Sequence, residues 1–290
     1  MAVAKVQADA HLYRIHSAFK RNSGYASSMA DTPEMDIAQA VACRLGRRAK
    51  VVLMTGSGMS AESGIPTFRD AQTGIWSKFR PEELATPEAF ERNPEKVWRW
   101  YEHRRKGVLA AQPHDGHRAL VELEQMVGSL VIITQNVDGL HQRSGSGKVL
   151  ELHGNIMRSI CSKSRREIDP EWMAQCTDQP PPSPHIQGAY ARPGVVWFGE
   201  SLPGTVIEES VKALESCTVC ITAGTSSLVH PAAGLPLVAK EAGALLVEIN
   251  PAATPLSRSA DYCLRLEAST ALATIVSARS RLDSIQGENG

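Results

Sequence analysis

Four short apolar runs along this chain each end in a cluster of small and polar residues. The runs occupy residues 51–55, 130–134, 218–223 and 245–249, and the clusters that follow them occupy residues 56–60, 135–138, 224–226 and 250–251. Continuous apolar runs of this length are typical of strands that are buried on both faces. The pattern therefore predicts an α/β fold, with a Rossmann-like parallel sheet and helices on both of its faces.

The polar clusters predict where a ligand binds. In open parallel sheets, ligands occupy the crevice beyond the carboxyl ends of the strands. Two of the clusters, residues 56–60 and 224–226, contain glycine, which lets backbone N–H groups approach a phosphate. The four clusters are therefore expected to meet at one nucleotide-binding cleft.

The rest of the pattern divides the chain into one main domain with two insertions. An amphipathic helix is expected over residues 37–48, with Asp36 as its N-cap. A long aromatic-rich segment separates the first two core strands, and a proline-rich segment follows His153. The expected parts are an N-terminal extension at 1–35, a main domain at 36–277 with insertions at about 66–128 (helical cap and cofactor loop) and about 154–191 (small domain), and a polar tail at 278–290.

Composition narrows the class of partner. Basic and acidic side chains balance at 31 each, so no excess positive charge favours binding to nucleic acid or to an anionic membrane. No apolar run approaches the roughly 18 residues of a membrane span. Six cysteines are scattered along the chain, several in strand-like runs, which favours free thiols and a cytoplasmic location.

The first 28 residues are basic and rich in serine, with a single acidic side chain. That composition loosely resembles an organelle transit peptide. A disordered extension has the same composition and is the favoured interpretation.

The first glycine cluster is part of a longer motif, because residues 56–69 read GSGMSAESGIPTFR. A glycine turn between a strand and a helix is suited to a pyrophosphate, although a GxG pair alone is a weak signal. Ala61 stands where a dinucleotide fingerprint would place its third glycine, which argues against a standard hydride-transfer site.

The extended string resembles the cofactor loop of the sirtuins, the NAD-dependent protein lysine deacylases. Further matches follow in the family's order, namely QNVDGLH at 135–141, ELHGN at 151–155, VVWFGE at 195–200, GTSS at 224–227 and EIN at 248–250. The likeness covers about residues 37–269, and chance agreement of six spaced motifs is negligible.

The resemblance implies that NAD binds in the predicted cleft. From residue type alone, Asn136 and Asp138 are typical of a turn. The resemblance implies that they bind the nicotinamide carboxamide, which needs a matched hydrogen-bond donor and acceptor. The residues implied to bind the cofactor are Gly56, Ser57, Gly58, Ala61, Phe68, Arg69, Trp76, Gln135, Asn136, Asp138, Gly224, Thr225, Ser226, Asn250, Pro251, Ala252 and Ala268.

The resemblance assigns catalysis to His153. A histidine beside an apolar strand is more often structural, but an unperturbed pKa near 6.5 suits a general base. In the family, this histidine draws a proton from the nicotinamide ribose after the acyl oxygen has displaced nicotinamide. The partner is implied to be an acylated protein lysine, whose peptide binds as an extended strand. The segment implied to contact that peptide consists of Val196, Trp197, Phe198 and Gly199.

Tyr101 and Arg104 lie three residues apart, on one face of a predicted helix. Periodicity alone favours an ordinary amphipathic helix with a solvated arginine. The stretch is similar to the class III sirtuins, whose Tyr-x-x-Arg pair binds the distal carboxylate of succinyl- or malonyl-lysine. A guanidinium binds a carboxylate bidentately and a tyrosine adds a hydroxyl donor, so the physical chemistry agrees.

The metal site of the family is largely missing. Most sirtuins hold a structural zinc with two Cys-x-x-Cys pairs after the catalytic histidine. Here Cys161 matches the first ligand, Ser164 stands at its partner position, and residues 183–188 contain no cysteine. Zinc is therefore doubtful, since one thiolate cannot form a tetrahedral site.

The small domain is therefore expected to be metal-free, and either held by packing of Ile160, Ile168 and Trp172 or partly mobile. A makeshift set of ligands, formed by Cys161, Cys176 and His185, is a less favoured alternative.

These features together predict a transferase-type enzyme that consumes NAD and releases nicotinamide and O-acyl-ADP-ribose. Succinyl and malonyl groups are the expected substrates, and acetyl a weaker one. One alternative is ADP-ribosyl transfer to protein, which needs no acyl receptor such as Tyr101 and Arg104. Another is a non-catalytic NAD-binding protein with a decayed zinc module, which would not need His153.

Overall fold

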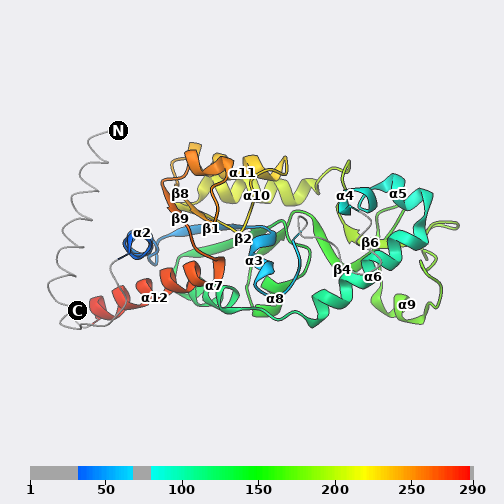
Figure 1. The fold of residues 1–290 in the computed structure, drawn as a ribbon, viewed down its shortest axis with the longest axis horizontal. Helices are drawn as coiled ribbons and strands as arrows, with labels where there is room; N and C mark the ends of the chain where they lie inside the picture. Colours follow the sequence, from blue (N-terminus) through cyan, green and yellow to red (C-terminus); the bar gives the residue numbers. More distant parts are fainter. Residues whose placement is uncertain (1–31, 68–79, 288–290) are drawn as a thin grey trace.

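The computed structural model describes residues 32–67 and 80–287, and its larger lobe is built on a six-stranded parallel sheet (Figure 1). The strand order is β3-β2-β1-β7-β8-β9. The strands are β1 (Lys50–Thr55), β2 (Ser129–Thr134), β3 (Val149–Glu151), β7 (Val219–Ala223), β8 (Leu245–Ile249) and β9 (Tyr262–Leu264). The predicted parallel sheet is confirmed, and the four apolar runs form its four central strands.

Helices cover both faces of this sheet. α2 (Pro33–Ala42), α7 (Asp115–Met126) and α12 (Ala268–Gly287) pack with it in one apolar core, and α10 (Gly204–Ser216) and α11 (Leu235–Glu241) in a second. Figure 1 shows α10 and α11 above the sheet and α7 and α12 below it. Across the described ranges, no helix combines the length and apolar character needed to span a bilayer.

The predicted start of the first helix is wrong, and two other helices cross or lie within segments that the sequence set apart. The first helix begins at Pro33 rather than after Asp36, because Thr32 caps it and proline suits the first helical position. It therefore includes residues assigned to the extension at 1–35. α7 lies within the expected insertion at 66–128 and packs in the apolar core of the main sheet. α12 continues through Gly287, well into the expected tail at 278–290, because its apolar face packs on α2 and α7.

The smaller lobe contains an antiparallel sheet of three strands in the order β5-β4-β6. Its elements are α4 (Pro81–Leu84), α5 (Pro87–Arg92), α6 (Pro94–Ala110), β4 (Gly154–Cys161), β5 (Glu167–Ile168), α9 (Pro170–Gln175) and β6 (Ala191–Val195). Short helices in the connections are α3 (Ser57–Ala61), α8 (Leu140–Ser144), η2 (Ala232–Gly234) and η3 (Pro255–Arg258).

Two apolar clusters hold the smaller lobe together. The first packs Phe90 and Tyr101, from α5 and α6, with Ile156 of β4 and Val195 of β6. The second contains Ile168 and Cys161, so the expected packing of Ile168 is confirmed. The expectation for Trp172 is wrong, because 40% of this residue is exposed on the short helix α9.

The loops after β1 and β7 pack directly backbone to backbone, at the point where the strand order reverses. The Gly58 N–H donates to the Gly224 carbonyl at 2.8 Å. A Cβ atom on Gly58 would lie 2.8 Å from the Gly224 Cα, and one on Gly224 would lie 2.3 Å from the Met59 nitrogen. Gly224 also has a φ of +62°, which favours glycine. Close loop contact therefore requires glycine on both sides.

Three histidines lie beneath the first of these loops. The His114 side chain caps α7, and its Nε2 contacts the Met59 carbonyl at 2.7 Å. His141 Nε2 contacts the Thr55 hydroxyl at 2.9 Å. His117 and His141 are fully buried, and burial lowers the pKa of His117 to about 2 and that of His141 to about 4. Both imidazoles are therefore neutral in the folded protein at neutral pH.

Gly58→Ala tests the loop contact. We expect it to lower the free energy of unfolding by about 1–3 kcal/mol, because the new methyl group meets backbone that has no room to move. Urea denaturation measures this change. Gly107→Ala is the control: nothing lies within 4 Å of its added Cβ in the interior of α6, so it should stabilise by about 0.5–1 kcal/mol. Equal effects of both substitutions on the free energy of unfolding would contradict the requirement for glycine at the loop contact.

Acidification should unfold the protein through the two buried histidines. Both folded-state pKa values lie below the unfolded value of 6.5, so below pH 6.5 the unfolded chain binds more protons. Each histidine then removes about 1.4 kcal/mol of stability per pH unit, down to its folded pKa. Urea titrations from pH 7.5 to 5 should show this slope, and His117→Gln should flatten it. Replacing the exposed His103 by glutamine should not.

Candidate functional site

The loops after four central strands meet and are linked by hydrogen bonds. Asn136 Nδ2, from the loop after β2, donates to the Gly56 carbonyl at 2.9 Å. Gln135 Nε2 donates to the Thr225 hydroxyl at 3.1 Å, and Asn250 Nδ2 donates to the Thr225 carbonyl at 2.9 Å. The polar clusters after β1, β2, β7 and β8 therefore lie together at the carboxyl edge of the sheet.

Ser60 joins the first loop to the second. Its hydroxyl accepts from Asn136 Nδ2 at 2.8 Å and donates to Asp138 Oδ2 at 2.7 Å. Asp138 Oδ1 accepts from the Leu140 N–H at 2.9 Å. Burial raises the pKa of Asp138 above its usual value, and the hydrogen bonds from Leu140 and Ser60 offset this only in part. Ser60 was not among the predicted site residues, although its place in the glycine motif is a signal that points to it.

His153 follows β3 and faces the same edge. Its Nδ1 lies 2.9 Å from the Gln135 carbonyl, which can only accept, so Nδ1 carries the proton and Nε2 keeps a free lone pair. Burial lowers the pKa of His153, and the bond to Gln135 partly offsets this. The imidazole is therefore a neutral base at neutral pH, with its basic nitrogen fixed as Nε2.

The helix α6 places Tyr101 and Arg104 side by side. Tyr101 is fully buried, and its hydroxyl oxygen accepts from Trp197 Nε1 at 2.9 Å. The Arg104 guanidinium lies 5.5 Å from the centre of the Tyr101 ring and 5.0 Å from that of the Trp100 ring. Burial raises the pKa of Tyr101 and lowers that of Arg104, whose charge is also stabilised by Tyr101 and Asp138. The structure thus brings the predicted acyl pair together, with the Arg104 guanidinium over the Tyr101 ring.

A neighbouring arginine anchors this helix. Arg105 Nε donates to the Ile156 carbonyl at 2.7 Å, and Nη2 donates to the Arg158 carbonyl at 3.0 Å. The ladder between β4 and β6 shifts register between Asn155 and Ser159, which leaves these carbonyls outside the strand pairing. Arg105 fills that gap and so fixes the position of α6, a role that its sequence context does not signal.

The segment that contains Val196, Trp197 and Phe198 uses its backbone donors internally. Their N–H groups donate to the His153 carbonyl, to Glu200 Oε2 and to the Ala85 carbonyl, at 2.8–2.9 Å. The Phe198 side chain is exposed. Within the described ranges, the N–H of the following Gly199 has no such acceptor. A peptide lying along this segment would therefore meet a donor at Gly199.

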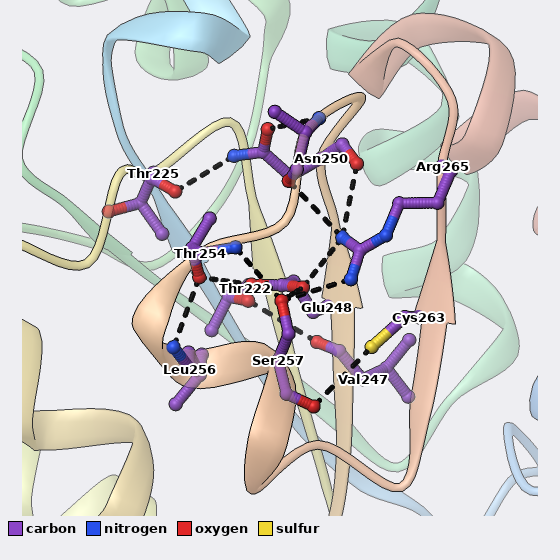
Figure 2. A network of polar contacts seen from close by, with 11 residues as sticks. Thr222, Thr225, Val247, Glu248, Asn250, Thr254, Leu256, Ser257, Cys263 and Arg265 are labelled. Atoms are coloured by element: carbon purple, nitrogen blue, oxygen red, sulfur yellow. Dashed lines mark hydrogen bonds and ion pairs between the residues drawn. The ribbon is translucent and has the colours of Figure 1, made fainter.

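A buried carboxylate organises the loop after β8 (Figure 2). Glu248 accepts from Thr254, from Ser257 at 2.5 Å and from Arg265 Nη1 at 2.7 Å. Although burial raises the pKa of Glu248, these donors lower it below its usual value. The same guanidinium contacts the Asn250 carbonyl at 3.3 Å, so the pair of charges shapes the loop that carries Asn250.

The other predicted cofactor residues lie around this edge, with three exceptions. Ser57 and Ala61 are the two ends of α3, Ser226 follows Thr225, Pro251 and Ala252 are exposed beyond β8, and Ala268 is buried where α12 begins. The predictions for Phe68, Arg69 and Trp76 fall outside the described residues.

Cys161 is buried among hydroxyl groups. Burial raises the pKa of the Cys161 thiol, but hydrogen bonding with Ser164 and Ser183 outweighs this and lowers the pKa to about 7. His185 Nε2 contacts the Glu167 carbonyl at 2.7 Å, so the alternative set of ligands is not assembled. Within residues 32–67 and 80–287, no three or more His, Cys, Asp or Glu side chains are grouped to hold a metal.

Comparison with known proteins agrees with this geometry. A profile of the Sir2 family matches residues 56–231. The NAD-dependent protein deacylase of Aquifex aeolicus is 50% identical over 222 residues, covering 77% of this chain and 92% of that protein. NAD-dependent protein deacylase 1 of Archaeoglobus fulgidus is 46% identical, covering 78% and 91%.

Solved structures agree as well. A Sir2 homologue in complex with NAD is 42% identical, with a TM-score of 0.76, over 88% of this chain and 97% of that one. A Sir2 protein with a deacetylated p53 peptide and 3'-O-acetyl ADP-ribose is 30% identical, with a TM-score of 0.72, over 84% and 97%. This chain belongs to the Sir2 family.

Proposed function

We propose that this protein is an NAD-dependent protein lysine deacylase that prefers short acidic acyl groups. The cleft fits the cofactor: the loops of four strands converge there, and the glycine contact brings backbone N–H groups of α3 to its edge. The names of the curated relatives and the NAD complex of a Sir2 homologue support this assignment.

NAD would supply an activated bond between ribose and nicotinamide, whose cleavage drives removal of the acyl group. Asn136 and Asp138 would orient the carboxamide, and the loops at Thr225 and Asn250 would hold phosphate and the adenosine ribose. His153 accepts a proton at Nε2, because its Nδ1–H is committed to the Gln135 carbonyl. Its lowered pKa keeps that nitrogen unprotonated at neutral pH.

The acyl preference rests on one observation, the contact between Tyr101 and Arg104. The Tyr101 oxygen accepts from Trp197 Nε1, so its own proton is left for another acceptor, and the Arg104 guanidinium lies 5.5 Å from the centre of the Tyr101 ring. A hydroxyl donor beside a desolvated guanidinium is complementary to a carboxylate. We propose that the distal carboxylate of succinyl- or malonyl-lysine binds here, while the peptide lies as an extended strand along Val196 to Gly199.

A cytoplasmic location is part of the proposal. The six cysteines, all of which lie in the described part of the chain, are free thiols. Such thiols persist in a reducing compartment.

His153→Ala tests the catalytic assignment. We expect formation of deacylated peptide from NAD and an acylated peptide to fall by roughly 100-fold or more, because general-base catalysis contributes about 10²–10⁴. Affinity for ADP-ribose, measured by calorimetry, should change little. Nicotinamide release that is independent of acylated peptide would instead favour ADP-ribosyl transfer, and binding of ADP-ribose without any release would favour the non-catalytic alternative.

Arg104→Met tests the acyl preference. Each charged hydrogen bond contributes about 1.5–3 kcal/mol, so kcat/KM for a succinyl-lysine peptide should fall at least about tenfold. For the matched acetyl-lysine peptide it should fall far less, since acetyl has no carboxylate. Arg99→Met is the matched control on the same helix, where the exposed Arg99 pairs with Glu95 at 2.5 Å. An equal loss on both peptides would refute the preference.

A further inference from the structure

The turn at residues 161–166 in the smaller lobe has an unusual conformation. Arg165 has a φ of +63°, a left-handed value that is uncommon for residues other than glycine. The turn is closed by the Arg165 N–H, which donates to the Cys161 carbonyl at 3.0 Å, and by the Cys161 N–H, which donates to the Arg166 carbonyl at 2.8 Å. This tight turn sends the Arg165 side chain out of the hairpin, toward the segment that contains Trp197.

The Arg165 guanidinium forms an ion pair with Glu200. Glu200 is also bound by Arg192, whose Nη1 and Nη2 reach its two oxygens at 2.7 Å and 2.9 Å. The carboxylate side chain is only 11% exposed. Although burial raises its pKa, the two arginines and the Trp197 N–H lower it to about 2. Glu200 is therefore a permanent negative charge, shared between the turn and β6.

This carboxylate also fixes Trp197. Glu200 Oε2 accepts from the Trp197 N–H at 2.8 Å, and the Arg192 guanidinium lies 3.4 Å from the centre of the Trp197 ring. The indole Nε1 of Trp197 then donates to the Tyr101 hydroxyl. A continuous set of contacts thus runs from Arg165, through Glu200 and Trp197, to the acyl pair on α6.

We propose that Arg165 and Glu200 are positioning residues for the acylated peptide, because they tie the 161–166 turn to the segment 196–199 and to Tyr101. This proposal rests on the proposed function, which places the peptide along that segment. Within the described ranges, the turn holds one cysteine and no cluster of metal ligands. Charge pairing and apolar packing must therefore fix its position. The fold of the small domain thereby sets the geometry of the substrate site.

Arg165→Gly is the variant that isolates the guanidinium. Glycine adopts the left-handed conformation without strain, so the turn is preserved while the ion pair is lost. We expect the KM for a succinyl-lysine peptide to rise about three- to fivefold, as for loss of a partly exposed ion pair, with kcat and the Kd of ADP-ribose unchanged. Arg165→Lys should restore part of the effect.

Arg166→Ala is the matched control, because Arg166 is the next residue, is exposed, and forms no ion pair within the described ranges. Glu200→Gln should raise the peptide KM more than tenfold, because it also leaves Arg192 unpaired. In that background Arg165→Gly should have no further effect. Raised salt should increase the KM of the wild type more than that of Arg165→Gly.

Two results would overturn the inference: a peptide KM that is unchanged in Arg165→Gly, or an equal rise in Arg166→Ala. A lower melting temperature with an unchanged peptide KM would likewise assign the ion pair to stability alone. If the wild type shows no acyl-dependent nicotinamide release, the proposed function fails. The positioning role is then tested by the Kd of a labelled succinyl-lysine peptide, measured by fluorescence anisotropy in the presence of ADP-ribose. The wild type, Arg165→Gly and Arg166→Ala are compared as before.

Discussion

The contact between the Gly58 N–H and the Gly224 carbonyl is the constraint on which the site depends. It joins two loops at the reversal of the strand order, and neither backbone could approach so closely with a side chain in between. Its consequence is that Ser60, two residues further on, reaches both Asn136 and Asp138. A buried carboxylate such as Asp138 requires these donors, so loop packing and site chemistry are inseparable.

The acyl pair depends on a second requirement, the satisfaction of buried polar groups. The Tyr101 hydroxyl lies in an apolar cluster, where an unpaired polar group would cost about 1–3 kcal/mol. The Trp197 indole, from the segment that follows β6, supplies the hydrogen-bond partner. Arg105 satisfies the carbonyls that the irregular β4 ladder leaves unpaired, and thereby holds α6 in register with that partner. The same bonds that satisfy buried atoms thus fix the position of Tyr101.

Sequence was sufficient for the strands and for most of the cleft, because both follow from local pattern. Buried parallel strands are apolar throughout, and their polar ends must share one edge. The start of α2 was missed because Asp36 lies in the first turn, where acids are also common, while Thr32 and Pro33 form the actual cap. The polar composition of α12 concealed a helix that is held by packing on α2 and α7.

The supporting contacts of the site were beyond such reasoning. Arg105 and Ile156 are 51 residues apart, and Gln135 and Thr225 are 90 apart. No local pattern distinguishes Arg105 from its neighbours on α6, because its role is set by a register shift in another element. Glu248 lies in a recognisable motif, yet only the folded loop brings Arg265, Thr254 and Ser257 to its carboxylate.

The smaller lobe shows how the small domain is stabilised when it keeps one cysteine, Cys161, at the positions of the sirtuin zinc ligands. The Ser164 N–H donates to the Cys161 sulfur at 3.4 Å, and the lowered pKa of the thiol reflects such contacts, which form no strong cross-link. The remaining contacts are the apolar packing of Ile168 against α6 and the charge pairs of Glu200. Packing is non-directional, whereas the bidentate Arg192–Glu200 pair fixes an orientation. Orientation of the turn relative to Trp197 must therefore come chiefly from charge, and its position from burial.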